Sequence, residues 1–84
     1  MSQIMSNDPI LANYIQQRAA HSGESPAKVA AQIDRNAFYE KVYALHERFM
    51  VGEFSLGYMA QQLDITKPDL YHLLDAMELK VTNV

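Results

Sequence analysis

Cysteine is absent from this chain of 84 residues, and glycine and proline occur only three times each. Without cysteine, the protein forms no disulfide, no thiolate metal site and no thiol nucleophile. No apolar run approaches the roughly 20 residues of a membrane-spanning helix, and no glycine-rich loop for phosphate is present. Because 49% of the residues are hydrophobic, the chain is expected to form one globular domain or two small helical units.

Basic residues are also few, since 7 Lys and Arg stand against 10 Asp and Glu, for a net charge of −3. Lys and Arg supply most of the non-specific affinity for nucleic acid, so we expect any DNA binding to be weak per monomer. The shortage is greatest in residues 54–84, where Lys67 and Lys80 are the only basic residues. The segment MSQIMSNDP lacks the basic start and apolar stretch of a signal peptide, so a cytoplasmic location is expected.

No group of residues has the spacing typical of a catalytic or metal site. The histidines stand apart in the sequence, at His21, His46 and His72. A zinc pair on one helix face needs two histidines at i and i+4 with a third ligand, and this spacing is missing. Ser22, Ser25 and Ser55 occur where helix caps are expected, which favours capping over nucleophilic catalysis. We therefore predict no enzyme, no metal and no cofactor.

The segment Ser55–Asp75, SLGYMAQQLDITKPDLYHLLD, has the pattern of two short helices that cross at a tight turn. Its predicted shared core consists of Met59, Leu63, Ile65, Leu70 and Leu73. Ala60 allows the helices to approach closely, and Asp64 occupies the turn because Asp enters the left-handed region at modest cost. Thr66 is the predicted cap of a second helix that begins near Lys67. The pattern predicts a helix-turn-helix.

The second of these helices has a predicted inner and outer face. Leu70, Leu73 and Leu74 are expected to face inward, and the expected DNA-binding residues are Thr66, Lys67, Tyr71 and His72. Lys67 would contact a phosphate, while Tyr71 and His72 would lie against base edges. Asp75 also points outward and would be repelled by phosphate. The alternative interpretation is a protein-interaction module that keeps the helix pair as a scaffold and uses an acidic surface.

The first half of the chain is predicted to hold two helices. Asp8-Pro9 opens a first helix that ends near His21, with an apolar stripe formed by Ile10, Leu11, Tyr14 and Ile15. Ser25-Pro26 opens a long second helix that stops at Val51-Gly52-Glu53. Its apolar residues recur every three to four positions, at Val29, Ile33, Ala37, Phe38, Val42, Leu45 and Phe49.

Such a helix of about 25 residues would span nearly 40 Å, more than the short neighbouring helices can cover. The stripe is therefore interpreted both as core and as the seam of a homodimer. The predicted dimer interface consists of Val29, Ile33, Phe38, Val42, Leu45 and Phe49. Tyr14, Tyr39 and Tyr43 lie on or beside the stripes as core or interface residues.

The whole chain is thus predicted to be an all-α protein of four helices. Its expected parts are a flexible N-terminus (1–8), a helical dimerisation region (9–53) and a helix-turn-helix with a short C-terminal extended segment (54–84). The β-branched alternation of Lys80–Val84 suits a short strand or an extended tail.

The sequence GEFSLGYMAQQLDITKPDLYHLLDAMELKV, within Val51–Val84, resembles the C-terminal half of a family of small prokaryotic proteins regarded as antitoxins. The residues that carry the likeness are Ser55, Leu56, Gly57, Ala60, Leu63, Leu70, Leu73, Leu74 and Leu79. Two positions depart from that family, because Asp64 replaces the usual turn glycine and Met77-Glu78 stands where a glycine is common.

The segment LANYIQQRAAHSGESPAKVAAQIDRNAFYE is similar to the two helices of ribbon-helix-helix antitoxins. Residues 2–7 lack the alternating basic strand that those proteins insert into DNA. Together the two resemblances imply a dimeric DNA-binding transcription regulator of the antitoxin type. A cognate toxin, or another protein, is the partner they imply.

Overall fold

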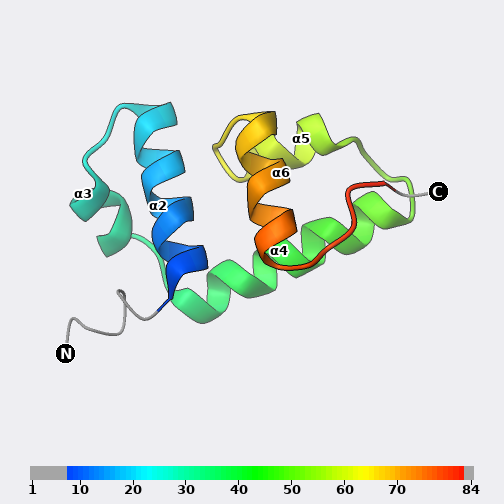
Figure 1. Ribbon diagram of the computed structural model, residues 1–84, viewed down its shortest axis with the longest axis horizontal. Helices are drawn as coiled ribbons and strands as arrows, with labels where there is room; N and C mark the ends of the chain where they lie inside the picture. Colours follow the sequence, from blue (N-terminus) through cyan, green and yellow to red (C-terminus); the bar gives the residue numbers. More distant parts are fainter. Residues whose placement is uncertain (1–7, 83–84) are drawn as a thin grey trace.

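The computed structural model describes residues 8–82, which form five helices and contain no strand. They are α2 (Pro9–Ser22), α3 (Pro26–Ala31), α4 (Arg35–Met50), α5 (Leu56–Gln62) and α6 (Lys67–Ala76). In Figure 1, α4 runs along one side of the molecule, with α2 and α3 near its amino end and α5 and α6 farther along. The all-α prediction is confirmed for this part of the chain.

Local capping signals determine where most helices begin and end. Asp8 accepts a hydrogen bond from the amide of Leu11, and Ser25 and Ser55 cap α3 and α5 in the same way. Gly23 ends α2 with a φ of +78°, which glycine adopts without a Cβ penalty. These boundaries agree with the predicted ones. Ser22 differs from the prediction, because its hydroxyl bonds to the carbonyl of Arg18 instead of capping a helix.

The predicted long helix is wrong, because the chain breaks between α3 and α4. The amides of Gln32 and Ile33 donate to the carbonyls of Val29 and Ala30, which closes α3 with a tight turn. Asp34 then adopts an extended conformation and accepts a hydrogen bond of 2.9 Å from the amide of Ala37, so it starts a new helix. The apolar spacing continues across the break because both helices pack on one core.

One core includes residues from all five described helices. Its fully buried large side chains are Leu11, Val29, Val42, Met59, Leu63, Leu70 and Leu74. Helix α2 packs against α3 and α6, and α5 packs against α6 and α4. The two predicted parts, 9–53 and 54–84, therefore share this core within the described residues.

The two ends of the chain are described only in part. Residues 1–7 of the predicted flexible N-terminus lie outside the described residues, whereas Asp8 is buried at the start of α2. Lys80–Thr82 form no strand, and residues 83–84 of the predicted extended segment also lie outside the description. The His46 ring is 2.8 Å from the carbonyl oxygen of Lys80, a hydrogen bond that holds the C-terminal segment against α4.

Candidate functional site

Helix α6 presents the residues that the sequence predicted for DNA contact. Thr66, Lys67, Tyr71 and His72 are all exposed. The hydroxyl of Thr66 accepts a hydrogen bond of 3.2 Å from the amide of Asp69, so Thr66 caps the helix as predicted. Lys67 is the first residue of α6, and it forms no ion pair within residues 8–82. The outer face of α6 is therefore accessible from its amino end.

The opposite face of α6 anchors the helix. Leu70, Leu73 and Leu74 are buried, as predicted, and so are Met59 and Ala60 of α5. The residues that were predicted to face inward on these two helices are therefore buried in the structure.

The turn between α5 and α6 is closed by hydrogen bonds within it. Asp64 adopts a φ of +59°, in the left-handed region predicted for it. Directly after it, the amide of Ile65 donates to the carbonyl of Ala60 at 3.1 Å, and Ile65 is buried. Ile65 is thereby directed into the core while Asp64 stays exposed.

Helix α2 makes hydrogen bonds to the end of α5 and to the first turn of α6. The hydroxyl of Tyr14 donates a hydrogen bond of 2.7 Å to the carbonyl of Leu63, and Gln17 reaches the carbonyl of Asp69 at 3.5 Å. Burial raises the pKa of Tyr14, and the positive charge of Arg18 opposes that rise. The proton needed for the hydrogen bond to Leu63 is therefore retained at neutral pH. The sequence predicted Tyr14 as a core or interface residue but gave no sign of this contact, which joins residues 49 positions apart.

The charges around α6 are mostly acidic. Asp64, Asp75 and Glu78 are exposed alongside Lys67. Arg18 of α2 lies 4.0 Å from the carboxylate of Asp64 and offsets part of that charge. A phosphate approaching α6 would therefore meet Lys67 at the amino end and repulsion farther along the helix.

The residues predicted for a dimer seam lie mainly inside the chain. Val29 and Val42 are fully buried, Phe38 and Phe49 are 6% exposed, and Ile33 and Leu45 are partly buried against the same core. The premise that one subunit cannot cover this stripe is wrong, because α2 and α5 cover it once the long helix is divided. The most exposed aromatic residue of α4 is Tyr43, at 52%.

Within residues 8–82, no cluster of His, Asp or Glu has the arrangement of a metal site. No helix in that range combines the length and apolar character needed to cross a membrane. No protein-family model, curated protein or solved structure matches the chain.

Proposed function

We propose that the protein is a small DNA-binding transcription regulator of the antitoxin type, with α5 and α6 as its helix-turn-helix. The observation that carries the proposal is the division of α6 into two faces. Its leucines are buried, whereas Lys67, Tyr71 and His72 are exposed together from the first residue of the helix onward. A recognition helix needs this division, because its amino-terminal residues contact base edges in the major groove. The resemblance of residues 51–84 to antitoxins agrees with it.

In this proposal Lys67 has one role, and Tyr71 and His72 share another. Lys67 contacts a phosphate through its side chain, which positions the helix without reading sequence. Tyr71 and His72 lie one helical turn farther along and contact base edges. Since few cations surround them, affinity is expected to be low, and its dependence on salt concentration is expected to be shallow.

A titration of labelled upstream DNA at two salt concentrations tests this function. Lys67→Ala is expected to weaken binding to all sequences alike and to lower the salt slope by about one unit. His72→Ala is expected to change the preference among sequences instead. Lys28→Ala, which removes the same charge from the exposed surface of α3, is the matched control and should leave binding unchanged. Absence of wild-type binding at low salt would overturn the proposal.

The second candidate is a non-enzymatic protein-interaction module, and the acidic surface around α6 favours it. Asp75 and Glu78 are exposed, and Tyr71 is 41% exposed beside them. Tyrosine is enriched in protein interfaces, where its ring is buried and its hydroxyl remains hydrogen-bonded. A cognate toxin would be such a partner. Asp75→Lys together with Glu78→Lys should weaken that complex, whereas Lys67→Ala should not.

We also propose that the protein acts as a homodimer, since helix-turn-helix regulators pair two half-sites. The exposed surface of α4 is the candidate interface, because Tyr43, Ala44 and the partly buried Met50 line one open pocket there. This surface replaces the buried stripe as the place of contact. Light scattering at micromolar concentration should give twice the chain mass, and a melting temperature that rises with concentration should accompany it. A monomer mass would contradict the proposal.

A further inference from the structure

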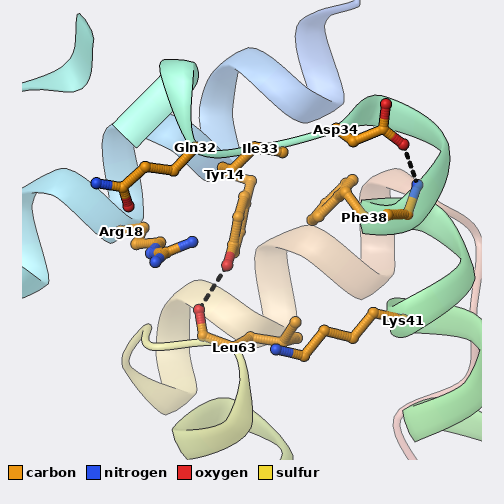
Figure 2. Close-up of a pocket in the computed structure, with 9 residues that line it drawn as sticks. Tyr14, Arg18, Gln32, Ile33, Asp34, Phe38, Lys41 and Leu63 are labelled. Atoms are coloured by element: carbon orange, nitrogen blue, oxygen red, sulfur yellow. Dashed lines mark hydrogen bonds between the residues drawn. The ribbon is translucent and has the colours of Figure 1, made fainter. Parts of the chain in front are cut away.

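A pocket of about 150 Å³ lies between α2, the segment that joins α3 to α4, the first half of α4, and the end of α5 (Figure 2). It is separate from the outer face of α6. The nine residues that line it are Tyr14, Arg18, Gln32, Ile33, Asp34, Ala37, Phe38, Lys41 and Leu63.

The floor of the pocket is apolar. Tyr14 and Phe38 stand next to each other with ring centroids 4.6 Å apart, and Ile33 and Leu63 complete the surface. The volume of about 150 Å³ matches that of a closed apolar cavity that binds benzene, although this pocket is open to solvent and polar side chains form part of its lining. The pocket therefore suits a ring-sized apolar group better than a water molecule or a simple ion.

Two cationic side chains line the same pocket. The side chain of Arg18 is only 25% exposed, and its one ion pair within residues 8–82 is the contact of 4.0 Å with Asp64, whose side chain is 60% exposed. A pair this long and this exposed contributes little, so the guanidinium remains available to a second carboxylate. Lys41 has no ion pair within residues 8–82.

The acidic lining residue, Asp34, is already engaged. Its carboxylate accepts the hydrogen bond from the amide of Ala37 that caps α4. Figure 2 shows Asp34 at one end of the pocket, whereas Arg18 and Lys41 extend toward the end at Leu63. The charge at that end is therefore net positive beside an apolar floor.

We propose that this pocket binds a small monocarboxylate with a ring-sized apolar body, of which benzoate is the simplest probe. The ring lies over Phe38 and Tyr14, and the carboxylate accepts hydrogen bonds from Arg18 and Lys41. An Asp or Glu side chain of a protein partner would satisfy the cations but leave the apolar floor uncovered. The proposal is independent of DNA binding.

The test is an NMR titration of backbone amides with benzoate and, separately, with benzyl alcohol, which has a similar shape and no charge. We expect benzoate to shift the amides of Ile33, Ala37 and Phe38 and to saturate with a dissociation constant of about 1 mM or tighter, as ligands of this size reach. Benzyl alcohol should bind at least ~10-fold more weakly because it lacks the charge-assisted hydrogen bonds.

Variants of the two cationic residues test whether each of them binds the carboxylate of benzoate. Arg18→Gln and Lys41→Gln should each weaken benzoate binding about 10-fold, whereas Lys28→Gln on α3 should leave it unchanged. The comparison with benzyl alcohol uses the wild-type protein, so it holds even if a variant is unstable. Shifts that stay linear to about 10 mM, ten times the expected constant, overturn the proposal. Equal affinity for the two probes, or binding of an acidic peptide but not of benzoate, would overturn it too.

Discussion

The Nε atom of Arg35 donates a hydrogen bond of 2.7 Å to Oδ2 of Asp8, which joins the residue that caps α2 to the first residue of α4. The hydroxyl of Tyr39 donates to the same carboxylate, at 2.9 Å to Oδ1. The guanidinium of Arg35 also lies 5.3 Å from the centroid of the Tyr39 ring. This carboxylate therefore stabilises a helix start and a contact between two helices at once.

Asp8→Ala is expected to lower the free energy of unfolding by about 2 to 3 kcal/mol, because it removes a cap and leaves Arg35 and Tyr39 without their acceptor. This loss is smaller than the loss from breaking a fully buried ion pair, because the side chain of Arg35 is 54% exposed. Asp34→Ala is the matched control, since Asp34 caps α4 but has no ion pair within residues 8–82, and should cost about 1 kcal/mol. Urea unfolding measures both. Equal losses would show that the contact between the helices contributes nothing.

The stability difference between wild type and Asp8→Asn should depend on pH. Burial raises the pKa of Asp8, but hydrogen bonds from the Leu11 amide, Arg35 and Tyr39 outweigh it, and the pKa lies below its ordinary value of 3.8. Folding therefore favours the ionised carboxylate. The ionised carboxylate of Asp8 contributes its full stabilisation at a pH above the ordinary pKa of 3.8. This stabilisation is lost as the pH falls through the lower pKa of the folded state.

Asparagine can also cap a helix, so the two proteins differ mainly in the charge at residue 8. Their difference in unfolding free energy therefore measures the contribution of that charge. Urea unfolding at pH 7 should show the wild type to be the more stable of the two. The difference should shrink steadily as the pH is lowered below about 4. A difference that is constant with pH would contradict the shifted pKa.

Tyr14→Phe should destabilise the protein by about 1 to 2 kcal/mol, because it removes the donor that satisfies the carbonyl of Leu63 while keeping the ring in the core. Tyr43→Phe removes the same atom from an exposed side chain of α4 and should change stability by less than about 0.5 kcal/mol. Thermal unfolding of the two variants provides the comparison. The idea fails if both have the wild-type melting temperature.

Glu78→Gly should stabilise the protein by about 1 kcal/mol, because Glu78 has a φ of +58° and glycine adopts that conformation without a Cβ penalty. Asp75→Gly, within α6, should instead destabilise by about 1 kcal/mol because glycine is a poor helix former. Chemical unfolding of both variants measures whether each substitution raises or lowers the free energy of unfolding. A loss of stability in Glu78→Gly would mean that its side chain makes a contact worth more than the strain.

Local signals in the sequence were enough to predict the helix starts at Asp8, Ser25, Ser55 and Thr66, as well as the left-handed turn residue Asp64. These features depend on residues three or four positions apart, so neighbouring side chains determine them. The buried face of α6 was predictable for the same reason, since helical periodicity alone assigns its leucines to one side.

Only the structure showed that residues 26–50 form two helices, although the cap at Asp34 is itself a local feature. An apolar spacing of three to four residues continues through Ile33 because both helices pack on the same core, so the pattern does not register the break at Asp34. Contacts between segments far apart in the chain determine that Val42 and Phe49 are buried within one chain. The same holds for the contact between Tyr14 and Leu63 and for the pairing of Asp8 with Arg35. Their distances are determined by how the helices pack, and no local pattern contains that information.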